Sequence, residues 1–379
     1  MSEMAVIYFD NAATTMQKPP EVTQALVNAL KSFGNPGRSF HGPAIEAARA
    51  VFDTRSELAK LVKLENPLNI AFTSGATESL NLVVNSLISP LDHVITSVLE
   101  HNSVLRPLYK TGCELSFIPS DDNGCLALEK LDSLLKANTR FMLCTHGSNL
   151  TGSVQDAEAL YNFCQKNGIV FILDVSQTLG CITVNAAMAD ILCFTGHKAL
   201  FGPQGTGGII VNRRLPFRLV KTGGSGSGSF DTSQPLEMPD IFEAGTANAH
   251  GLAGLCQGAA FINRTGLSSV EALTSRLLLE FLDGVSGIPG VRLYGGGKQR
   301  LPVAALNLGS MPANSVTSQL WENRQIATRS GSHCAPLAHK FYKTEAQGMV
   351  RFSFSLFNTS EEITVALNEL KTIAKNGVC

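Results

Sequence analysis

The chain has 379 residues, of which 44% are hydrophobic and 16% charged, so it can bury a large core and is expected to form two domains. A formal net charge of -1, with no long run of lysine and arginine, excludes the electrostatic footprint of a protein that binds nucleic acid or an anionic membrane. A small-molecule ligand is therefore the better expectation.

The sequence also suggests where the protein works. No apolar stretch approaches the roughly 20 residues that cross a bilayer, and residues 1–5 lack the build of a secretion signal, so we expect a cytoplasmic protein. The nine cysteines are dispersed and include no C-x-x-C pair. This pattern favours reduced thiols and predicts neither disulfides nor a metal site.

The first two thirds of the chain alternate between predicted strands and helices. Residues 8–15 form a short extended piece, and residues 18–30 and 43–61 are predicted helices. Strands are predicted at 69–73, 94–98, 115–118, 140–144, 169–173, 191–194 and 208–211, with helices at 80–88, 103–109, 126–135 and 157–166. Strands without polar alternation, separated by helices, are typical of an α/β fold with a mostly parallel sheet sandwiched by helices.

The last third has a different pattern. A helical stretch runs from residue 247 through 260 and 267 to 282, and short strands follow at 291–294, 304–308 and 350–354. This pattern predicts a second, smaller α+β domain. We expect a large domain over residues 16–253 and a small domain over residues 1–15 and 254–379.

A short Ser-Gly-Ala-Thr-Glu turn at residues 74–78 joins a predicted strand to a predicted helix. Such a junction gathers free backbone N–H groups and the positive end of a helix dipole at one point. Gly75, Ala76 and Thr77 are therefore candidates to bind a phosphate. The simpler interpretation is that Ser74 or Thr77 only caps the helix.

Polar clusters follow four of the predicted strands. In parallel sheets ligands bind outside the carboxyl ends of the strands, so these clusters are expected to meet. Each alone has an ordinary explanation, as a helix cap, a turn or a solvated carboxylate, but four together favour a ligand site. The clusters are Glu100-His101-Asn102, His146-Gly-Ser-Asn149, Asp174-Val-Ser-Gln177 and Thr195-Gly-His197-Lys198.

Lys198 is the candidate reactive group. In a partly desolvated pocket a lysine can lose its proton, and the neutral amine can then bond covalently to a carbonyl cofactor such as pyridoxal phosphate. Taken alone, it would be read as an ordinary surface lysine after a strand.

Together with three motifs further along, these clusters resemble the cysteine desulfurase and selenocysteine lyase family of class V, fold-type I pyridoxal phosphate enzymes. The resemblance spans nearly the whole chain in the family's order and implies the fold-type I transferase fold. The R-x-G-x-x-C-A form around Cys334 resembles the SufS-like branch. The three motifs are Glu243-Ala-Gly-Thr246, Arg329-Ser-Gly-Ser-His-Cys334-Ala-Pro and Arg351 in the stretch towards Glu362.

The resemblance implies a role for each matching residue at the cofactor. Lys198 would hold the cofactor and move the Cα proton, Asp174 would keep the ring nitrogen protonated, and His101 would stack on the ring. Thr246 would reach the phosphate of the neighbouring subunit, which implies a homodimer with shared sites. Gln177 and Asn149 would contact the phenolic oxygen of the cofactor ring. Thr77, Thr195 and His197 would bind the cofactor phosphate together with backbone N–H groups.

The resemblance also implies a substrate end. Arg351, helped by Arg329 and Asn149, would bind the carboxylate of L-cysteine. Cys334 would attack the substrate sulfur, leaving a persulfide on the enzyme and alanine as the second product. Its polar, partly cationic setting favours the thiolate; the alternative is an inert thiol in a loop.

Several alternatives remain open from the sequence. A selenocysteine lyase would use the same residues on L-selenocysteine, an aminotransferase of this fold would make Cys334 incidental, and a cofactor-binding scaffold would only recruit partners. Residues 223–230 are a linker by composition, but the resemblance favours a loop near the partner's active site. A sulfur-acceptor protein is a possible partner, and its identity is left open.

Overall fold

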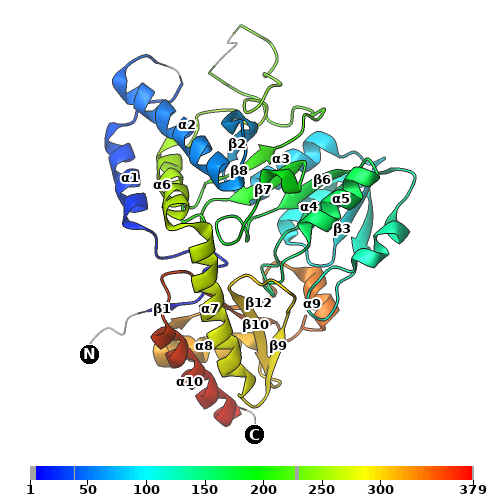
Figure 1. Ribbon diagram of the computed structural model, residues 1–379, viewed down its shortest axis with the longest axis vertical. Coiled ribbons are helices and arrows are strands. Elements are labelled where there is room, and N and C mark those ends of the chain that lie inside the picture. The colour runs from blue at the N-terminus through cyan, green and yellow to red at the C-terminus, as the bar shows by residue number, and fades with distance from the viewer. Residues whose placement is uncertain (1–5, 38, 227–229, 378–379) are drawn as a thin grey trace.

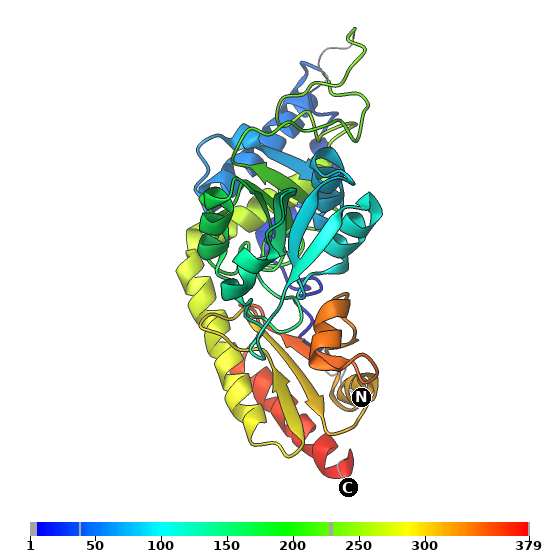
Figure 2. The same ribbon diagram turned by 90° about the vertical axis from the view of Figure 1, so that its right-hand side faces the viewer.

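The computed structural model describes residues 6–37, 39–226 and 230–377. Residues 1–5, which bear on the secretion signal, and residues 227–229 of the glycine-serine loop lie outside the described residues. The molecule is elongated, with a large layered part at one end and a smaller part at the other (Figures 1 and 2). Helix α7 (Leu267–Ser286) runs along both parts.

The large part is organised around a seven-stranded sheet. Strand β8 runs antiparallel to both of its neighbours, and the other pairs are parallel, which confirms the predicted α/β class with a mostly parallel sheet. In sheet order the strands are β2 (Ile70–Thr73), β8 (Gly207–Val211), β7 (Ile191–Thr195), β6 (Val170–Asp174), β5 (Thr139–Thr145), β3 (His93–Ser97) and β4 (Glu114–Ile118).

Both faces of this sheet are covered by helices, so successive strand residues enter two different cores. In β7, Leu192 and Phe194 belong to one hydrophobic cluster, whereas Ile191 and Cys193 belong to another. The first face packs against α2 (Gly42–Val62), α5 (Ala157–Lys166) and α6 (Ala249–Thr265), and the second against α3 (Ala76–Leu87) and α4 (Asn102–Thr111). Helix α1 (Pro20–Ser32) packs on α6.

The smaller part contains a four-stranded antiparallel sheet with its own core, as the predicted α+β region requires. Its strand order is β12 (Arg329–Gly331), β13 (Met349–Ser353), β10 (Val303–Leu308) and β9 (Val291–Tyr294). Helices α7, α8 (Ala313–Arg324) and α10 (Ser360–Gly377) cover one face, and α9 (Pro336–Tyr342) lies between this sheet and the larger part (Figure 1).

Two predicted helices differ from the structure. The stretch predicted from residue 247 to 282 is two helices, α6 and α7, because Gly266 has a φ of +82°, a conformation that breaks a helix and suits glycine. The helix predicted at 126–135 is a 3₁₀ helix over Leu128–Leu134.

The N-terminal segment joins the two parts. Only β1 (Ile7–Tyr8) is a strand, paired with β11 (Ile326–Ala327), and a turn follows at residues 11–13. Ser353 N donates to Phe9 O at 2.7 Å, and Thr15 N donates to His197 O at 3.0 Å. The segment therefore crosses from the small sheet to the strand ends of the large one. The domain boundaries at residues 15 and 253 stay predictions.

Two further predictions bear on the surroundings of the protein. None of the described helices combines the length and apolarity that a membrane crossing requires. The cytoplasmic location stays a prediction. The eight cysteines in the described ranges are free thiols, and these ranges contain no cluster of three or more His, Cys, Asp or Glu side chains arranged for a metal ion.

Candidate active site

A cavity of about 380 Å³ lies where the loops after β3, β5, β6 and β7 meet. Because these strands are parallel, their polar clusters reach the same edge of the sheet. The cavity brings together twelve of the residues predicted from sequence: Gly75, Ala76, Thr77, His101, Asn149, Asp174, Gln177, Thr195, His197, Lys198, Arg329 and Arg351. Thr246 and Cys334 are the two predicted residues that do not line it.

Lys198 follows β7, and its position lowers the pKa of its amine. Removal from water lowers this pKa from 10.5 to about 8, and the carboxylate of Asp174 opposes part of the shift. The hydroxyl of Thr15 donates to Lys198 O at 2.8 Å and fixes the backbone there. A substantial fraction of the amine is therefore neutral near physiological pH, as a nucleophilic lysine requires.

Asp174 is the last residue of β6 and is buried. Its Oδ1 accepts hydrogen bonds from Ser176 N at 2.9 Å and from the Ser176 hydroxyl. These bonds fix the orientation of the carboxylate, and its negative charge acts on both Lys198 and His101.

His101 caps α4 and is held as a neutral ring. Its Nδ1 accepts a hydrogen bond from Ser103 N at 3.0 Å, which leaves the ring proton on Nε2. Burial, and then the positive charge of Lys198, lower the pKa of His101 to about 4. Burial likewise lowers the pKa of His197 to about 4, and its buried Nδ1 lacks a hydrogen-bond partner among the described residues.

The turn before α3, which the sequence predicts to bind a phosphate, is packed closely against β8. Gly75 has a φ of +149°, and β8 approaches it so closely that a Cβ on Gly207 would lie 2.5 Å from Gly75 Cα. The first N–H groups of α3 have no partner within the helix. Thr77 Oγ1 lies 2.7 Å from Ser103 Oγ, so this turn and the His101 cap are tied together.

Two arginines form the opposite end of the cavity. Arg329 on β12 and Arg351 on β13 are directly paired in the antiparallel register, so their side chains share a face. The Arg351 side chain is fully buried, donates to Asp10 Oδ1 at 2.6 Å and donates to Asn149 O at 2.9 Å. Its buried Nε has no partner in the part of the chain that the structure describes, which leaves a donor for a ligand.

Cys334 lies in the short loop between β12 and α9, and this loop is tied to the cavity through its backbone. Asn149 Nδ2 donates to His333 O, and Asn102 N donates to Cys334 O, both at 2.8 Å. His333 and Cys334 both have left-handed backbones, with φ of +49° and +56°. Cys334 is partly exposed. The Asn149 amide, predicted to face the cofactor, thus also holds the cysteine loop.

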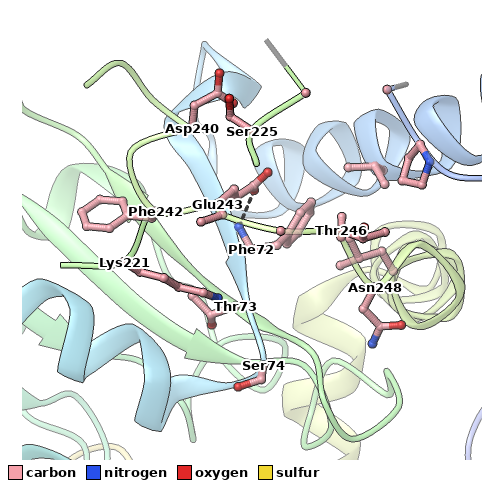
Figure 3. Close-up of a pocket in the computed structure, with 18 of the residues that line it drawn as sticks. Phe72, Thr73, Ser74, Lys221, Ser225, Asp240, Phe242, Glu243, Thr246 and Asn248 are labelled. Atoms are coloured by element: carbon pink, nitrogen blue, oxygen red, sulfur yellow. Dashed lines mark hydrogen bonds between the residues drawn. The ribbon is translucent and has the colours of Figure 1, made fainter. Parts of the chain in front are cut away.

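Thr246 lines a second cavity of about 360 Å³ that shares Ser74, Glu78 and Gly205 with the first. Figure 3 shows Thr246 in this cavity together with Thr73, Ser74 and Asn248. Glu243, from the same motif, accepts a hydrogen bond from Phe72 N at 2.6 Å and pairs with Arg55. Glu243 therefore anchors this segment to β2 and α2.

The sequence analysis assigned no role to two acidic residues beside the cavity. Asp10 lies between the buried Phe9 and Asn11, and a charge in such a segment signals a buried partner. Glu100 is fully buried, its Oε1 accepts from Thr145 N at 3.1 Å and from Ser97 Oγ, and burial raises its pKa to about 8. The signal for Glu100 was its position directly after a strand, beside His101.

Comparison with known proteins gives the same picture over nearly the whole chain. The aminotransferase class-V family model matches residues 7–365. A probable cysteine desulfurase from Methanothermobacter thermautotrophicus and a cysteine desulfurase from Escherichia coli O9:H4 are each 30% identical, over 98% of this chain and 95% and 94% of theirs. The apo structure of a cysteine desulfurase from Thermococcus onnurineus NA1 superposes with a TM-score of 0.91 at 31% identity, over 98% of this chain and 95% of that one.

The chain therefore belongs to the aminotransferase class-V family. Within this family it is an enzyme of the cysteine desulfurase kind, since relatives and a solved structure that match it over nearly their full length are cysteine desulfurases. The resemblance inferred from the motifs is confirmed. Membership of the SufS-like branch and the roles of the individual residues stay predictions.

Proposed function

We propose that the protein is a pyridoxal phosphate-dependent cysteine desulfurase that converts L-cysteine to L-alanine and leaves a persulfide on Cys334. The observation that supports this most is the presence of Lys198, with its lowered pKa, in one cavity with Asp174 and two arginines. An amine nucleophile, a carboxylate and a carboxylate-binding end are what such a reaction requires.

The residues present fit pyridoxal phosphate. Gly75, Ala76 and Thr77 offer N–H groups to a phosphate, and the cavity of about 380 Å³ also holds Thr195 and His197, whose buried Nδ1 is without a partner in the described part of the chain. Asp174, whose carboxylate is held by Ser176, would keep a ring nitrogen protonated. When bound, the cofactor would supply an electron sink for bonds broken at the substrate Cα.

The protein's own groups would then move the protons. Lys198, with a pKa of about 8, can take the Cα proton as a neutral amine and return it as an ammonium. His101 is neutral with its proton on Nε2, so it can donate a hydrogen bond without adding positive charge. This arrangement gives the two groups separate tasks.

Arg351 and Arg329 would hold the substrate carboxylate, and Cys334 would take the sulfur. The thiolate of Cys334 attacks the substrate sulfur, so that an S–S bond forms while the Cβ–S bond breaks. The electron pair of the broken bond stays on the substrate carbon, which takes up a proton to give alanine. Atoms and electrons balance without an added oxidant.

The active unit is proposed to be a homodimer. Thr246 lies outside its own chain's Lys198 cavity, as a residue that serves the neighbouring subunit would. The cavity that Thr246 lines shares Gly37 and Ala48 with a hollow of about 1050 Å³, and this hollow and several exposed apolar side chains remain uncovered in the single chain. These side chains are Phe40 and Ile45, with Phe52 and Leu236 close by in sequence.

The test compares Cys334→Ser with Cys125→Ser. Cys125 is the control because both thiols are partly exposed, while only Cys334 follows His333, whose carbonyl accepts a hydrogen bond from the cavity residue Asn149. Alanine release from L-cysteine and from L-selenocysteine is measured with the cofactor-loaded proteins. We expect Cys334→Ser to lose L-cysteine turnover by at least about 100-fold while it keeps its cofactor absorbance.

The outcomes are distinct. Unchanged L-cysteine turnover in Cys334→Ser contradicts the persulfide route. Wild-type turnover of L-selenocysteine alone would make the enzyme a selenocysteine lyase, and a keto-acid requirement would make it an aminotransferase. No cofactor absorbance after incubation with pyridoxal phosphate would remove the proposal altogether.

A further inference from the structure

The carboxylate of Asp10 contacts Arg351, one of the two arginines that line the cavity, although no role in the reaction has been assigned to it so far. It reaches Arg351 NH2 at 2.6 Å, and its own side chain is 21% exposed whereas that of Arg351 is 0% exposed. A fully buried guanidinium is costly without a counter-charge. Asp10 supplies that charge from a segment 341 residues away in the chain.

The backbone fixes Asp10 in this position. Ser353 N donates to Phe9 O at 2.7 Å, Asn11 Nδ2 donates to Ser353 O at 2.9 Å, and Ala12 N donates to Ser353 Oγ at 2.9 Å. Phe9 is itself buried against Phe352 and Phe354. The residues on both sides of Asp10 are thus tied to β13, the strand that carries Arg351.

The charges at this end do not cancel. Arg329 and Arg351 face each other across the β12–β13 pair, and like charges directly opposite on neighbouring strands repel. Asp10 offsets one of the two positive charges. The remaining single charge matches one carboxylate of an incoming ligand, and a second carboxylate would enter without a partner.

We propose that Asp10 is a positioning and specificity residue, which holds Arg351 in place and restricts the site to amino acids that carry one carboxylate. This inference rests on the proposed function, because it takes Arg329 and Arg351 as the residues that bind the substrate carboxylate. It concerns which amino acids are accepted and leaves the chemical step to the other residues.

Two variants separate the two parts of this role. Asp10→Asn keeps an oxygen acceptor for Arg351 and removes the charge, whereas Asp10→Ala removes both. Glu21→Gln is the matched control, since it removes the carboxylate of an exposed ion pair with Arg264 at 2.9 Å. All three are studied as cofactor-loaded full-length proteins.

The first measurement is the affinity of the protein for amino acids, which is monitored through the absorbance of the bound cofactor. L-alanine and L-aspartate differ by one carboxylate. In Asp10→Asn we expect the affinity for L-aspartate relative to L-alanine to rise at least about tenfold over wild type, because an uncompensated positive charge is left at the site. In Glu21→Gln the affinity for L-aspartate relative to L-alanine should equal that of the wild type. An unchanged ratio in Asp10→Asn overturns the specificity role.

The second measurement is the kinetics of L-cysteine turnover. In Asp10→Ala we expect KM to rise at least about tenfold while kcat changes much less, because substrate orientation depends on a held Arg351. An unchanged KM overturns the positioning role. If the wild type does not turn over L-cysteine, the proposed function fails, while the alanine and aspartate titrations still report on Asp10. If Asp10→Ala does not fold, Asp10→Leu, which also removes both the charge and the acceptor but keeps the size of the side chain, replaces it in this measurement.

Discussion

The two ends of the active-site cavity are assembled in different ways. The end that we propose to hold the cofactor is built from the turn at residues 74–78 and the ends of β3, β5, β6 and β7 of one sheet. The substrate end takes Asp10 from the N-terminal segment and Arg329 and Arg351 from the small sheet. A single rigid sheet thus positions one end, whereas contacts between distant segments position the other.

This difference predicts that changes at the cofactor end have the larger effects on chemistry. Asp174→Asn keeps the shape of the side chain and removes its charge. We expect kcat for L-cysteine to fall by about 100-fold or more, because the ring nitrogen loses its counter-charge. The measurement is steady-state alanine release at saturating L-cysteine.

Asp156→Asn is the control for this change, because Asp156 only caps α5 and asparagine is an equally good cap. If the kcat of Asp174→Asn stays within a few-fold of wild type, the prediction that changes at the cofactor end have the larger effects on the chemical step is wrong.

The second prediction concerns pH. Because the folded-state pKa of Lys198 is lowered to about 8, the neutral fraction of its amine rises from about one tenth at pH 7 to about nine tenths at pH 9. The rate at which the cofactor-free protein takes up pyridoxal phosphate should therefore rise about tenfold over this range. Stopped-flow absorbance measures it, and a midpoint near 10.5 would mean that the cavity does not desolvate this amine.

The smallest expected effect concerns Glu100. Its folded-state pKa is raised from 4.5 to about 8, so the folded protein binds more protons than the unfolded chain between these values and loses stability as pH rises through them. Glu100→Gln stays neutral and should lose this dependence, with a Tm at pH 8.5 a few degrees above wild type and a similar Tm at pH 4.5.

Glu129→Gln, at an exposed position, should leave the thermal profile unchanged. A Glu100→Gln protein that is less stable at both pH values would show instead that the ionised carboxylate supports the fold.

The same comparison explains which parts of the fold and of the candidate site could be predicted from the sequence. Strand 191–195 was predictable because it is a run of apolar residues buried on both faces, and a polar turn marks where it ends. His101, Asn149, Asp174 and Lys198 follow such strands, so a local pattern placed them together. That pattern depends only on short stretches of sequence.

The substrate end was harder to predict because its geometry depends on tertiary contacts. Nothing local to Asp10 indicates Arg351, since the pairing arises from the hydrogen bonds between residues 9–12 and Ser353. The position of the Cys334 loop likewise depends on Asn102 and Asn149, which come from other strand ends. The break at Gly266 was missed because apolar periodicity continues through it on both sides.

The left-handed backbone at both His333 and Cys334 has a consequence for protein engineering. Two successive non-glycine residues in this conformation are unfavourable by about 1 kcal/mol or more each, so contacts outside the loop must stabilise its conformation. Asn149 and Asn102 impose that shape through His333 O and Cys334 O. Grafting residues 332–335 onto another scaffold would therefore transfer the cysteine without its left-handed backbone conformation, unless both asparagine donors were transferred with it.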